Sequence, residues 1–565
     1  MRNLLCILLI FIIALPMPGC AVRNASPKQP DGRFYDVIVF GAGPEGIAAG
    51  VSASRNGLKT LLVERSGKIG GLYTRAGLNT IDMNFGPDKE LLTKGIFENF
   101  YNALGSDSFD IGRAEGIFSR MLTNAGVYLM LNADVGKPEV EDGKITGIEI
   151  NGAKYRAKRY IDATEDADIA AMSGVPYTYG QEDIGHPERV MAPTMVFKLE
   201  GVDWNKVRRY LNTDDSKETG ANDRSAWGYH EMYKYKPKDP DILMRGLNMG
   251  RQDDGSVLVN SMLIYNVDIM DKDSREKAVE KATRELPYVI EYMHKLPGLE
   301  DVRLAGIMDE FYSRESRHII GEYRLSLDDV LENRYFGDAV VLGSYSVDIQ
   351  AFMRGNFGWI LGKPQVYSIP FRCLVPKKID NLLVAGRSAS FDSLASGSAR
   401  VVPVGMDEGQ AAGAAAKISI KKNMPFRQMA YDEGTVDQLQ KLLTKQGAYI
   451  KDYEATPDIV KSPYYPYIKR LRRYGYIQGS YGNDYRLDEV ISRDDFTKIF
   501  NSIMADHIAN YEWLPGKVSG MPMTYGQAGE IFKDYGINFE LSNSDEELYY
   551  KDAYKLLCTV LDQIE

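Results

Sequence analysis

The chain has 565 residues, of which 44% are hydrophobic, and a formal net charge of −10. A chain of this length and composition can bury a large core and is expected to hold two or three domains. Its negative charge argues against a nucleic-acid partner, because the phosphate backbone would repel an acidic surface.

The beginning of the chain predicts an export signal. Arg2 precedes an apolar run over residues 4–15, which is too short to span a bilayer but has the size of a signal-peptide core. The stretch "PMPGC" that follows resembles a bacterial lipobox, which implies lipid attachment at Cys20. We expect a signal peptide and lipobox over residues 1–20, a polar tether over 21–33, and anchoring to a membrane of a bacterial envelope, periplasmic or at the cell surface. An ordinary signal peptide with an incidental cysteine is the alternative.

The cysteines and histidines predict neither a disulfide framework nor a metal site. Cys6 and Cys20 belong to the leader, and Cys373 and Cys558 lie far apart without metal-like spacing. Only five histidines are scattered through the chain. We therefore expect no metal, and chemistry carried by a cofactor or by carboxylates and arginines.

The first folded segment predicts a strand, a glycine turn, a helix and a second strand. "YDVIVF" (residues 35–40) is short and β-branched, as in a buried parallel strand. In the turn that follows, Gly41 permits a tight bend, Gly43 lets the backbone approach a pyrophosphate, and Gly46 allows close helix–strand packing. The second strand ends at Glu64, which would accept hydrogen bonds from an adenosine ribose. The pattern predicts a bound dinucleotide.

The next segment distinguishes FAD from NAD by resemblance. Gly70 and Gly71 in "ERSGKIGGLYTRAG" resemble the loop that runs along the ribityl chain in FAD-binding flavoproteins of the glutathione-reductase type. A strand hairpin expected within residues 129–174 resembles the hairpin that leads to the adenine side in those proteins. Glu165 stands here where they have a glycine.

A return segment is expected near residue 385. "NLLVAG", ending at Gly386, predicts a strand, and "GQAAGAAA" (409–416) predicts a helix with little side-chain bulk, packed tightly beneath a cofactor. The N-terminus of that helix would direct positive potential at the flavin.

Three further segments carry a family resemblance: "RESRHIIGEYRLSLDDVL" (314–331), "GSYSVDIQ" (343–350) and "IPFRCLVPKKIDNLLVAGRS" (369–388). With the glycine motifs they resemble FAD-dependent oxidoreductases related to the fumarate reductase and succinate dehydrogenase flavoproteins. The resemblance covers roughly residues 34–420 and implies FAD and redox work far more firmly than any substrate.

This resemblance implies an α/β fold with a discontinuous Rossmann-like FAD-binding domain. We expect its two parts at residues 34–175 and 339–422, an inserted α+β substrate domain at 176–338, and a helical C-terminal region at 423–565. FAD is expected to bind non-covalently, because no histidine lies near the N-terminal flavin loop to form the usual link. The expected cofactor-binding residues are Gly41, Gly43, Pro44, Glu45, Gly46, Glu64, Arg65, Gly70, Gly71, Val135, Gly386, Arg387 and Arg400.

Two groups of residues are candidates for catalysis. In "RESRH", Arg317 and His318 follow Arg314, and the group could form a substrate anion clamp or proton relay. The alternative is an ion-pair knot with Glu315 and Glu322 that joins two domains.

The second group lies closer to the flavin helix. Arg400 could stabilise reduced flavin or grip a substrate oxygen, and Asp348 is a candidate base. Gln350 stands where relatives often have histidine, and it cannot take up a proton at neutral pH.

The C-terminal region has a different composition, rich in tyrosine and charge. Residues 462–504 resemble a single S-layer homology repeat, which raises the possibility of contact with a cell-wall glycan. The alternative is a helical lid or packing module for the flavoprotein.

We expect an FAD-dependent oxidoreductase that transfers a hydride between flavin N5 and a small polar substrate outside the cytoplasm, with an electron acceptor that the sequence does not name. The arginines favour a carboxylate, whereas the aromatic insertion, including Trp227 and Tyr233, would favour a carbohydrate if it does not form core. The alternative is a cell-wall or glycan-binding lipoprotein on a flavoprotein scaffold.

Overall fold

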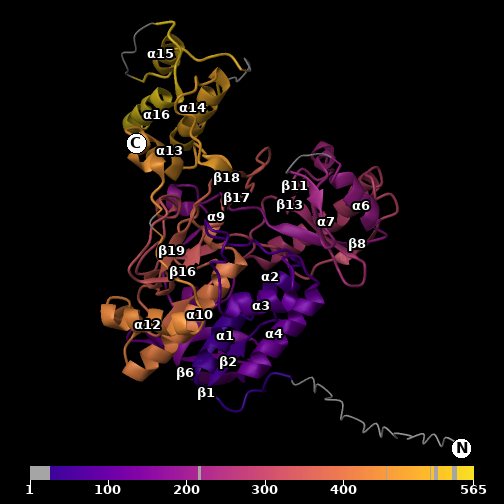
Figure 1. Ribbon diagram of the computed structural model, residues 1–565, viewed down its shortest axis with the longest axis vertical. Helices are drawn as coiled ribbons and strands as arrows, with labels where there is room; N and C mark the ends of the chain where they lie inside the picture. The colour runs from indigo at the N-terminus through magenta and orange to yellow at the C-terminus, as the bar shows by residue number, and fades with distance from the viewer. Residues whose placement is uncertain are drawn as a thin grey trace, which may run out of the picture.

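The computed structural model describes residues 26–213, 218–453, 455–508, 511–514, 520–537 and 544–564. The predicted signal peptide and its lipidated Cys20 lie outside these residues. Figure 1 shows an α/β body at the bottom, a second sheet beside it at the right, and a helical lobe at the top that ends at the C-terminus. None of the helices in the described ranges is both long and apolar enough to cross a membrane.

The body is built on a parallel sheet. Its core strands are β1 (Phe34–Phe40), β2 (Thr60–Val63), β3 (Tyr128–Met130) and β6 (Ala153–Asp162), in the order β3-β2-β1-β6. β20 (Leu382–Val384) returns from the far end of the sequence to pair in parallel with β6. Strands buried on both faces need helices on each side, which explains their near-continuous β-branched and aliphatic sequences. The Rossmann-like α/β fold, interrupted and then resumed, is confirmed.

A hairpin extends this sheet. β4 (Val135–Glu141) and β5 (Lys144–Ile150) pair antiparallel, and β5 pairs antiparallel with β6. The predicted hairpin is therefore present, with its turn at Asp142 and Gly143 in left-handed conformations.

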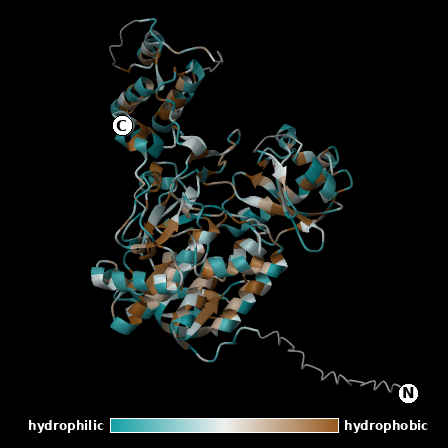
Figure 2. Ribbon diagram, in the orientation of Figure 1, coloured by the Kyte–Doolittle hydropathy of each residue, from teal (hydrophilic) through white to brown (hydrophobic). Residues whose placement is uncertain are grey.

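Two helices pack unusually closely beneath the sheet. α1 (Pro44–Arg55) crosses α10 (Val402–Lys422) at Gly409 and Gly413. A Cβ at these glycines would lie 2.1 Å from Glu45 O and 2.6 Å from Ala49 O. The small-residue run thus lets the two backbones touch. Figure 2 shows hydrophobic residues concentrated in the strands and inner helices of this body, whereas α12 (Glu433–Lys445) on the outside is mainly hydrophilic.

The second sheet is antiparallel and has its own core. Its strands lie in the order β14 (Arg303–Ile307), β8 (Thr194–Glu200), β13 (Val257–Ile264), β12 (Leu247–Arg251), β10 (Ser225–Gly228) and β9 (Gly220–Ala221), with β11 (Ile242–Met244) paired to β13. The helices α6 (Trp204–Leu211) and α7 (Lys272–Met293) cover it. Its core includes Phe197, Val259 and Leu286. Trp227 and Tyr233 are 40% and 50% exposed, so the core interpretation of these two aromatic residues is wrong.

The C-terminal lobe comprises the described residues from 455 onward. Ser492 caps α14 (Arg493–His507), as "ISRDDF" predicts, and its hydroxyl accepts from Asp495 N. Ile468 and Leu471 of α13 (Tyr465–Arg473) are buried in the core of the lobe. The S-layer resemblance of this region stays a prediction.

The remaining helices are α2 (Gly71–Thr74), α3 (Ile96–Leu104), α4 (Ile111–Ala125), α5 (Asp168–Met172), α8 (Leu327–Leu331), α9 (Ser396–Ala399), α11 (Phe426–Met429), α15 (Tyr525–Asp534) and α16 (Tyr550–Ile564). The remaining strands are β7 (Tyr177–Tyr179), β15 (Arg317–Ile319), β16 (Ala339–Gly343), β17 (Val347–Ile349), β18 (Trp359–Gly362) and β19 (Tyr367–Pro370).

Candidate cofactor and substrate site

The glycine turn after β1 has the geometry of a phosphate-binding loop. Gly41 has a φ of +88°, and a Cβ there would lie 2.4 Å from Ala163 O, while one at Gly46 would lie 1.8 Å from Gly41 O. Gly43 differs, because its Cβ would meet only Glu45 Oε2, at 3.1 Å. Gly43 is also the N-cap of α1 and supplies no side-chain cap, as at a helix start that binds an anion.

The glycine pair lies against this turn. Gly70 and Gly71 both have positive φ, and Gly70 N donates to Ala42 O at 2.7 Å. A Cβ at Gly71 would lie 3.1 Å from the Cα of Gly43. The structure therefore brings together two glycine motifs that are separated in the sequence by a helix and a strand.

Glu64 lies at the end of β2 and is almost fully buried. Its carboxylate accepts from Ala42 N at 2.7 Å and from Ser66 N at 2.8 Å, and pairs with Arg75 at 3.2 Å. Glu64 thus fixes the glycine turn itself, a task that the sequence did not reveal. Its contact with an adenosine ribose stays a prediction.

Arg65 and Arg317 meet at one carboxylate. Arg65 lies 2.8 Å from Asp168, and Arg317 lies 2.9 Å from the other oxygen of Asp168. Of the predicted ion-pair knot, only the contact of His318 with Glu315 is present among the described residues, because Arg317 pairs with Asp168 and Glu322 pairs with Arg427. His318 lies 3.3 Å from Glu315 and is buried.

Gly386 and Arg387 follow β20 and lie close to the glycine turn, since a Cβ at Gly386 would lie 3.2 Å from Glu45 Cγ. Gly386 has a φ of +101°, and its N–H donates to Glu408 Oε2 at 2.7 Å. Arg387 donates to Ser316 Oγ at 2.8 Å and to Asp166 Oδ1 at 2.6 Å. Its Nε is buried and has no hydrogen-bond partner among the described residues.

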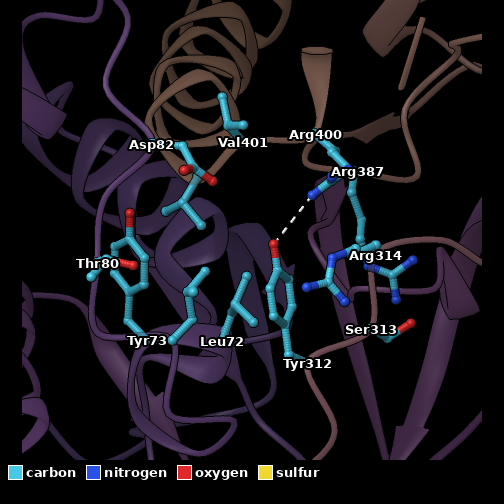
Figure 3. Close-up of a pocket in the computed structure, with 12 residues that line it drawn as sticks. Leu72, Tyr73, Thr80, Asp82, Tyr312, Ser313, Arg314, Arg387, Arg400 and Val401 are labelled. Carbon is cyan, nitrogen blue, oxygen red and sulfur yellow. Dashed lines mark hydrogen bonds between the residues drawn. The ribbon is translucent and has the colours of Figure 1, made fainter. Parts of the chain in front are cut away.

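Beside these turns lies a small pocket that opens to solvent (Figure 3). Figure 3 shows arginines gathered on one side of it and Asp82, Thr80 and Tyr73 on the other, with Tyr312 between them. The lining residues are Leu72, Tyr73, Leu78, Thr80, Asp82, Tyr312, Ser313, Arg314, Arg387, Arg400, Val401 and Val402. Three segments thus meet at the pocket: the chain that follows the glycine pair, the start of α10, and residues 312–314 after β14. Of the residues predicted for catalysis, Arg400 is in this set, whereas Arg317 and His318 are not.

Arg400 is the centre of a polar chain. Its guanidinium donates to Tyr312 Oη at 3.2 Å and to Asp348 Oδ2 at 3.3 Å. Both oxygens of Asp348 also accept from Gln350 Nε2, at 2.7 and 2.9 Å. Gln350 Oε1 in turn accepts from Arg245 at 2.5 Å. The structure therefore joins the predicted residues Arg400 and Asp348 directly.

Arg314 and Asp82 also line the pocket. The sequence placed Arg314 in the candidate anion clamp with Arg317 and His318, whereas Asp82 was not predicted as a site residue. Arg314 is 3% exposed, donates to Thr194 Oγ1 at 2.8 Å, and lies 3.8 Å above the ring of Tyr312. Within the described ranges Arg314 forms no ion pair. Burial, with the neighbouring positive charges of other arginines, lowers the pKa of Arg314 to about 10, so it remains a cation at neutral pH.

Asp82 faces the arginines from the other wall. Burial raises the pKa of Asp82, the charge of Asp348 adds to the rise, and Arg400 opposes it. Asp82 accepts from Tyr345 Oη at 3.1 Å. The sequence around Asp82, "NTIDMNFG", contains no motif. The one feature of the sequence that could have pointed to Asp82 as a site residue is its position shortly after the glycine pair.

The residues present fit a bound FAD. The uncapped N-terminus of α1 suits a diphosphate, as does the absence of a side chain at Gly43, where an added Cβ would meet only Glu45 Oε2. The N-cap of α10, Val401, also supplies no side-chain cap, and the buried Nε atoms of Arg387 and Arg400 have no partner in the described part of the chain. Val135, which was predicted to bind the cofactor, is the first residue of β4. It is partly buried and packs against the hydrophobic cluster that includes Tyr35 and Ile148.

These glycine turns, two uncapped helix starts and the adjoining polar pocket define an enzyme that binds a dinucleotide cofactor. A profile of the FAD dependent oxidoreductase family matches residues 36–443. The chain belongs to that family, is an oxidoreductase, and uses FAD.

The chain is also similar to individual proteins over shorter segments. Glutathione reductase of Schizosaccharomyces pombe is 28% identical over 148 residues, covering 22% of this chain and 31% of that protein. Digeranylgeranylglycerophospholipid reductase of Methanococcus aeolicus is 30% identical over 160 residues, covering 25% and 41%. This chain thus spans less than half the length of either relative. A geranylgeranyl bacteriochlorophyll reductase-like protein of Thermoplasma acidophilum aligns over 84% of this chain and 97% of its own, with 13% identity and a TM-score of 0.37.

Proposed function

We propose that this oxidoreductase transfers a hydride between FAD and a small carboxylate substrate held in the arginine-lined pocket. The observation that carries the proposal is the buried Arg314, which has no carboxylate partner in the described ranges although its pocket holds two more arginines. A desolvated guanidinium without a counter-ion is costly, and a bound anion removes that cost.

The geometry favours a carboxylate over a carbohydrate. A guanidinium offers a planar fork of N–H donors that matches a carboxylate. Asp348 engages Arg400, but Arg314 has only a hydroxyl and a carbonyl as acceptors. A neutral sugar would leave this cation unpaired, whereas an acid would neutralise it.

Asp82, which lines the pocket, and Asp348, which contacts Arg400, have different roles in this proposal. Asp348 already accepts from Gln350 and Arg400, which suits it to orient Arg400. The Asp82 carboxylate accepts a hydrogen bond from Tyr345, and burial raises the pKa of Asp82, which suits it to accept a proton. Bound FAD supplies the two-electron acceptor. The substrate then loses a hydride from carbon and a proton from the neighbouring hydroxyl, the proton passing to Asp82.

We also propose that this reaction takes place outside the cytoplasm. The support is the leader sequence and Cys20, which lie outside the described residues. Replacing Cys20 by Ala should abolish incorporation of labelled fatty acid and release the protein from the membrane fraction. Membrane retention without the cysteine would contradict the lipid anchor.

The substrate class is tested with protein that lacks residues 1–25, loaded with FAD and kept anaerobic. Small 2-hydroxy acids should bleach the visible flavin absorbance, and neutral polyols and sugars of matched size should not. Arg314→Ala should raise KM for the acid about thirtyfold or more, because a buried charge loses its partner, and Arg314→Lys should restore part of it.

The control is Arg284→Ala on the exposed side of α7, which should leave KM unchanged. Bleaching by sugars alone, or an unchanged KM in Arg314→Ala with normal FAD content, would overturn the carboxylate assignment.

A further inference from the structure

A loop of the C-terminal lobe is joined to the strand hairpin beside the pocket. Gly479 N donates to Leu361 O at 2.8 Å, and Lys363 N donates to Asn483 Oδ1 at 2.8 Å. Asn483 Nδ2 returns a bond to Lys363 O at 2.6 Å. Loop 479–483 therefore extends the edge of β18 much as another strand would.

The strand that it extends belongs to the same hairpin as Asp348. β17 and β18 pair antiparallel, and Asp348 lies opposite Ile360. Because Asp348 contacts Arg400, which lines the pocket, this hairpin adjoins the pocket through that contact. The loop of the C-terminal lobe is thus connected to Arg400 through β18, β17 and Asp348. Figure 1 shows β17 and β18 between the body and α13.

The loop presents one aromatic side chain. Tyr481 lies in a single 3₁₀ turn and is 68% exposed. On either side of it Ser480 and Asn483 have φ values of +52° and +50°, left-handed conformations that a loop adopts when the surrounding contacts impose them. Partial burial, followed by the negative charges of Asp348 and Asp82, raises the pKa of Tyr481. Its phenol therefore remains protonated at neutral pH and can donate a hydrogen bond.

The lobe that carries this loop is fixed to the body at two other points. Arg472 is 1% exposed and lies 2.7 Å from Asp328 of α8. Arg189 lies 2.6 Å from Asp506 at the end of α14. These ion pairs hold the lobe in one orientation, so the position of Tyr481 is determined by the fold.

We propose that Tyr481 is a substrate-contacting residue that the C-terminal lobe supplies to the pocket of the body. Its phenol donates a hydrogen bond to the bound substrate, and its ring closes the pocket on the side of the β17–β18 hairpin, which limits the length of the acid. The identity of the ligand as an acid rests on the proposed function, whereas the position of Tyr481 does not.

The position is tested first, without any substrate. Cys373 and Cys558 are buried, so a cysteine placed at position 481 can be labelled selectively with a bulky neutral maleimide. Labelled Tyr481→Cys should slow the anaerobic reduction of bound FAD by dithionite severalfold, because the label covers the mouth of the pocket. The matched control is labelled Tyr549→Cys, at a 38% exposed tyrosine of the same lobe, which should leave that rate unchanged. Equal rates for the labelled and the unlabelled Tyr481→Cys protein would overturn the inference.

The contact is tested second, with a 2-hydroxy acid that bleaches the flavin. Tyr481→Phe should raise KM about fivefold to tenfold with little change in kcat, as expected for one lost neutral hydrogen bond. Tyr481→Ala should raise KM further and admit longer acids. Wild-type KM in both variants would overturn the inference while leaving the proposed function intact. A slowed dithionite reaction in a protein that turns over no acid would instead overturn the proposed function and retain Tyr481 at the pocket mouth.

Discussion

At the scale of single residues, Glu45 stands out because its carboxyl lies at the diphosphate turn. Its side chain packs against α10, and a Cβ at Gly405 would lie 2.6 Å from Glu45 Cγ. Burial raises the pKa of Glu45 to about 7, with a further rise from Glu165 and an opposing effect from Arg387. The groups facing Glu45 are its own backbone N–H, Glu165, Arg387, Glu408 and Tyr73.

This arrangement predicts that FAD binding depends on pH. The diphosphate adds negative charge beside Glu45, so the complex favours the protonated carboxyl and raises its pKa further. FAD affinity should therefore be constant below pH about 7 and fall above it, by about tenfold per pH unit until the pKa of the complex is reached. Fluorescence titration of apoprotein with FAD across this range measures the effect. Glu45→Gln should flatten the profile, and Glu433→Gln, at the start of α12, should retain it. Parallel profiles for wild type and Glu45→Gln would contradict the prediction.

At the scale of elements, the crossing of α1 and α10 positions both uncapped helix starts. Gly413→Ala should force the helices apart, since its Cβ would lie 2.6 Å from Ala49 O. Overpacking of this kind costs about 1–3 kcal/mol, and FAD content should fall with it. Urea unfolding and the flavin-to-protein absorbance ratio measure the two effects. In Gly434→Ala the added Cβ would meet only Asp432 Oδ1 at 3.8 Å, so stability should be unchanged or slightly higher. Equal stability of the two variants would show that the crossing tolerates a wider spacing.

The same elements mark where sequence reasoning succeeds. The strand, the glycine turn and α1 were predicted because β-branched runs and glycines with positive φ encode them locally. α10 was predicted because a run of small residues has few uses other than close packing. Asp82 comes from a segment with no local signature, and although "RESRH" marked Arg314 as a candidate, only tertiary packing brings Arg314 and not Arg317 or His318 to the pocket. The periodicity of the sequence likewise could not predict the contact of loop 479–483 with β18, because the contact joins a loop and a strand that lie far apart in the chain.

At the scale of the whole molecule, one buried ion pair joins the C-terminal lobe to the body. Arg472 Nη2 donates to Asp328 Oδ1 at 2.7 Å and to Tyr465 Oη at 3.0 Å, and Arg472 and Asp328 are 1% and 5% exposed. Arg473 lies 2.6 Å from the second oxygen of Asp328. Because water is excluded from this contact, removing the acid leaves Arg472 as an uncompensated buried charge.

Asp328→Asn should therefore loosen the lobe by about 3–5 kcal/mol while the FAD-binding body stays folded. Hydrogen exchange should increase across α13 and at residues 479–483, and limited proteolysis should begin near residue 455, with flavin content unchanged. Since the lobe carries Tyr481, the KM for the acid should rise as it does in Tyr481→Ala. Asp562→Asn removes an acid that is 60% exposed, paired with Arg470, and should change none of these properties. If Asp328→Asn left exchange, proteolysis and KM at wild-type values, the lobe would be held by its other contacts, and the Arg472 pair would not control the position of Tyr481.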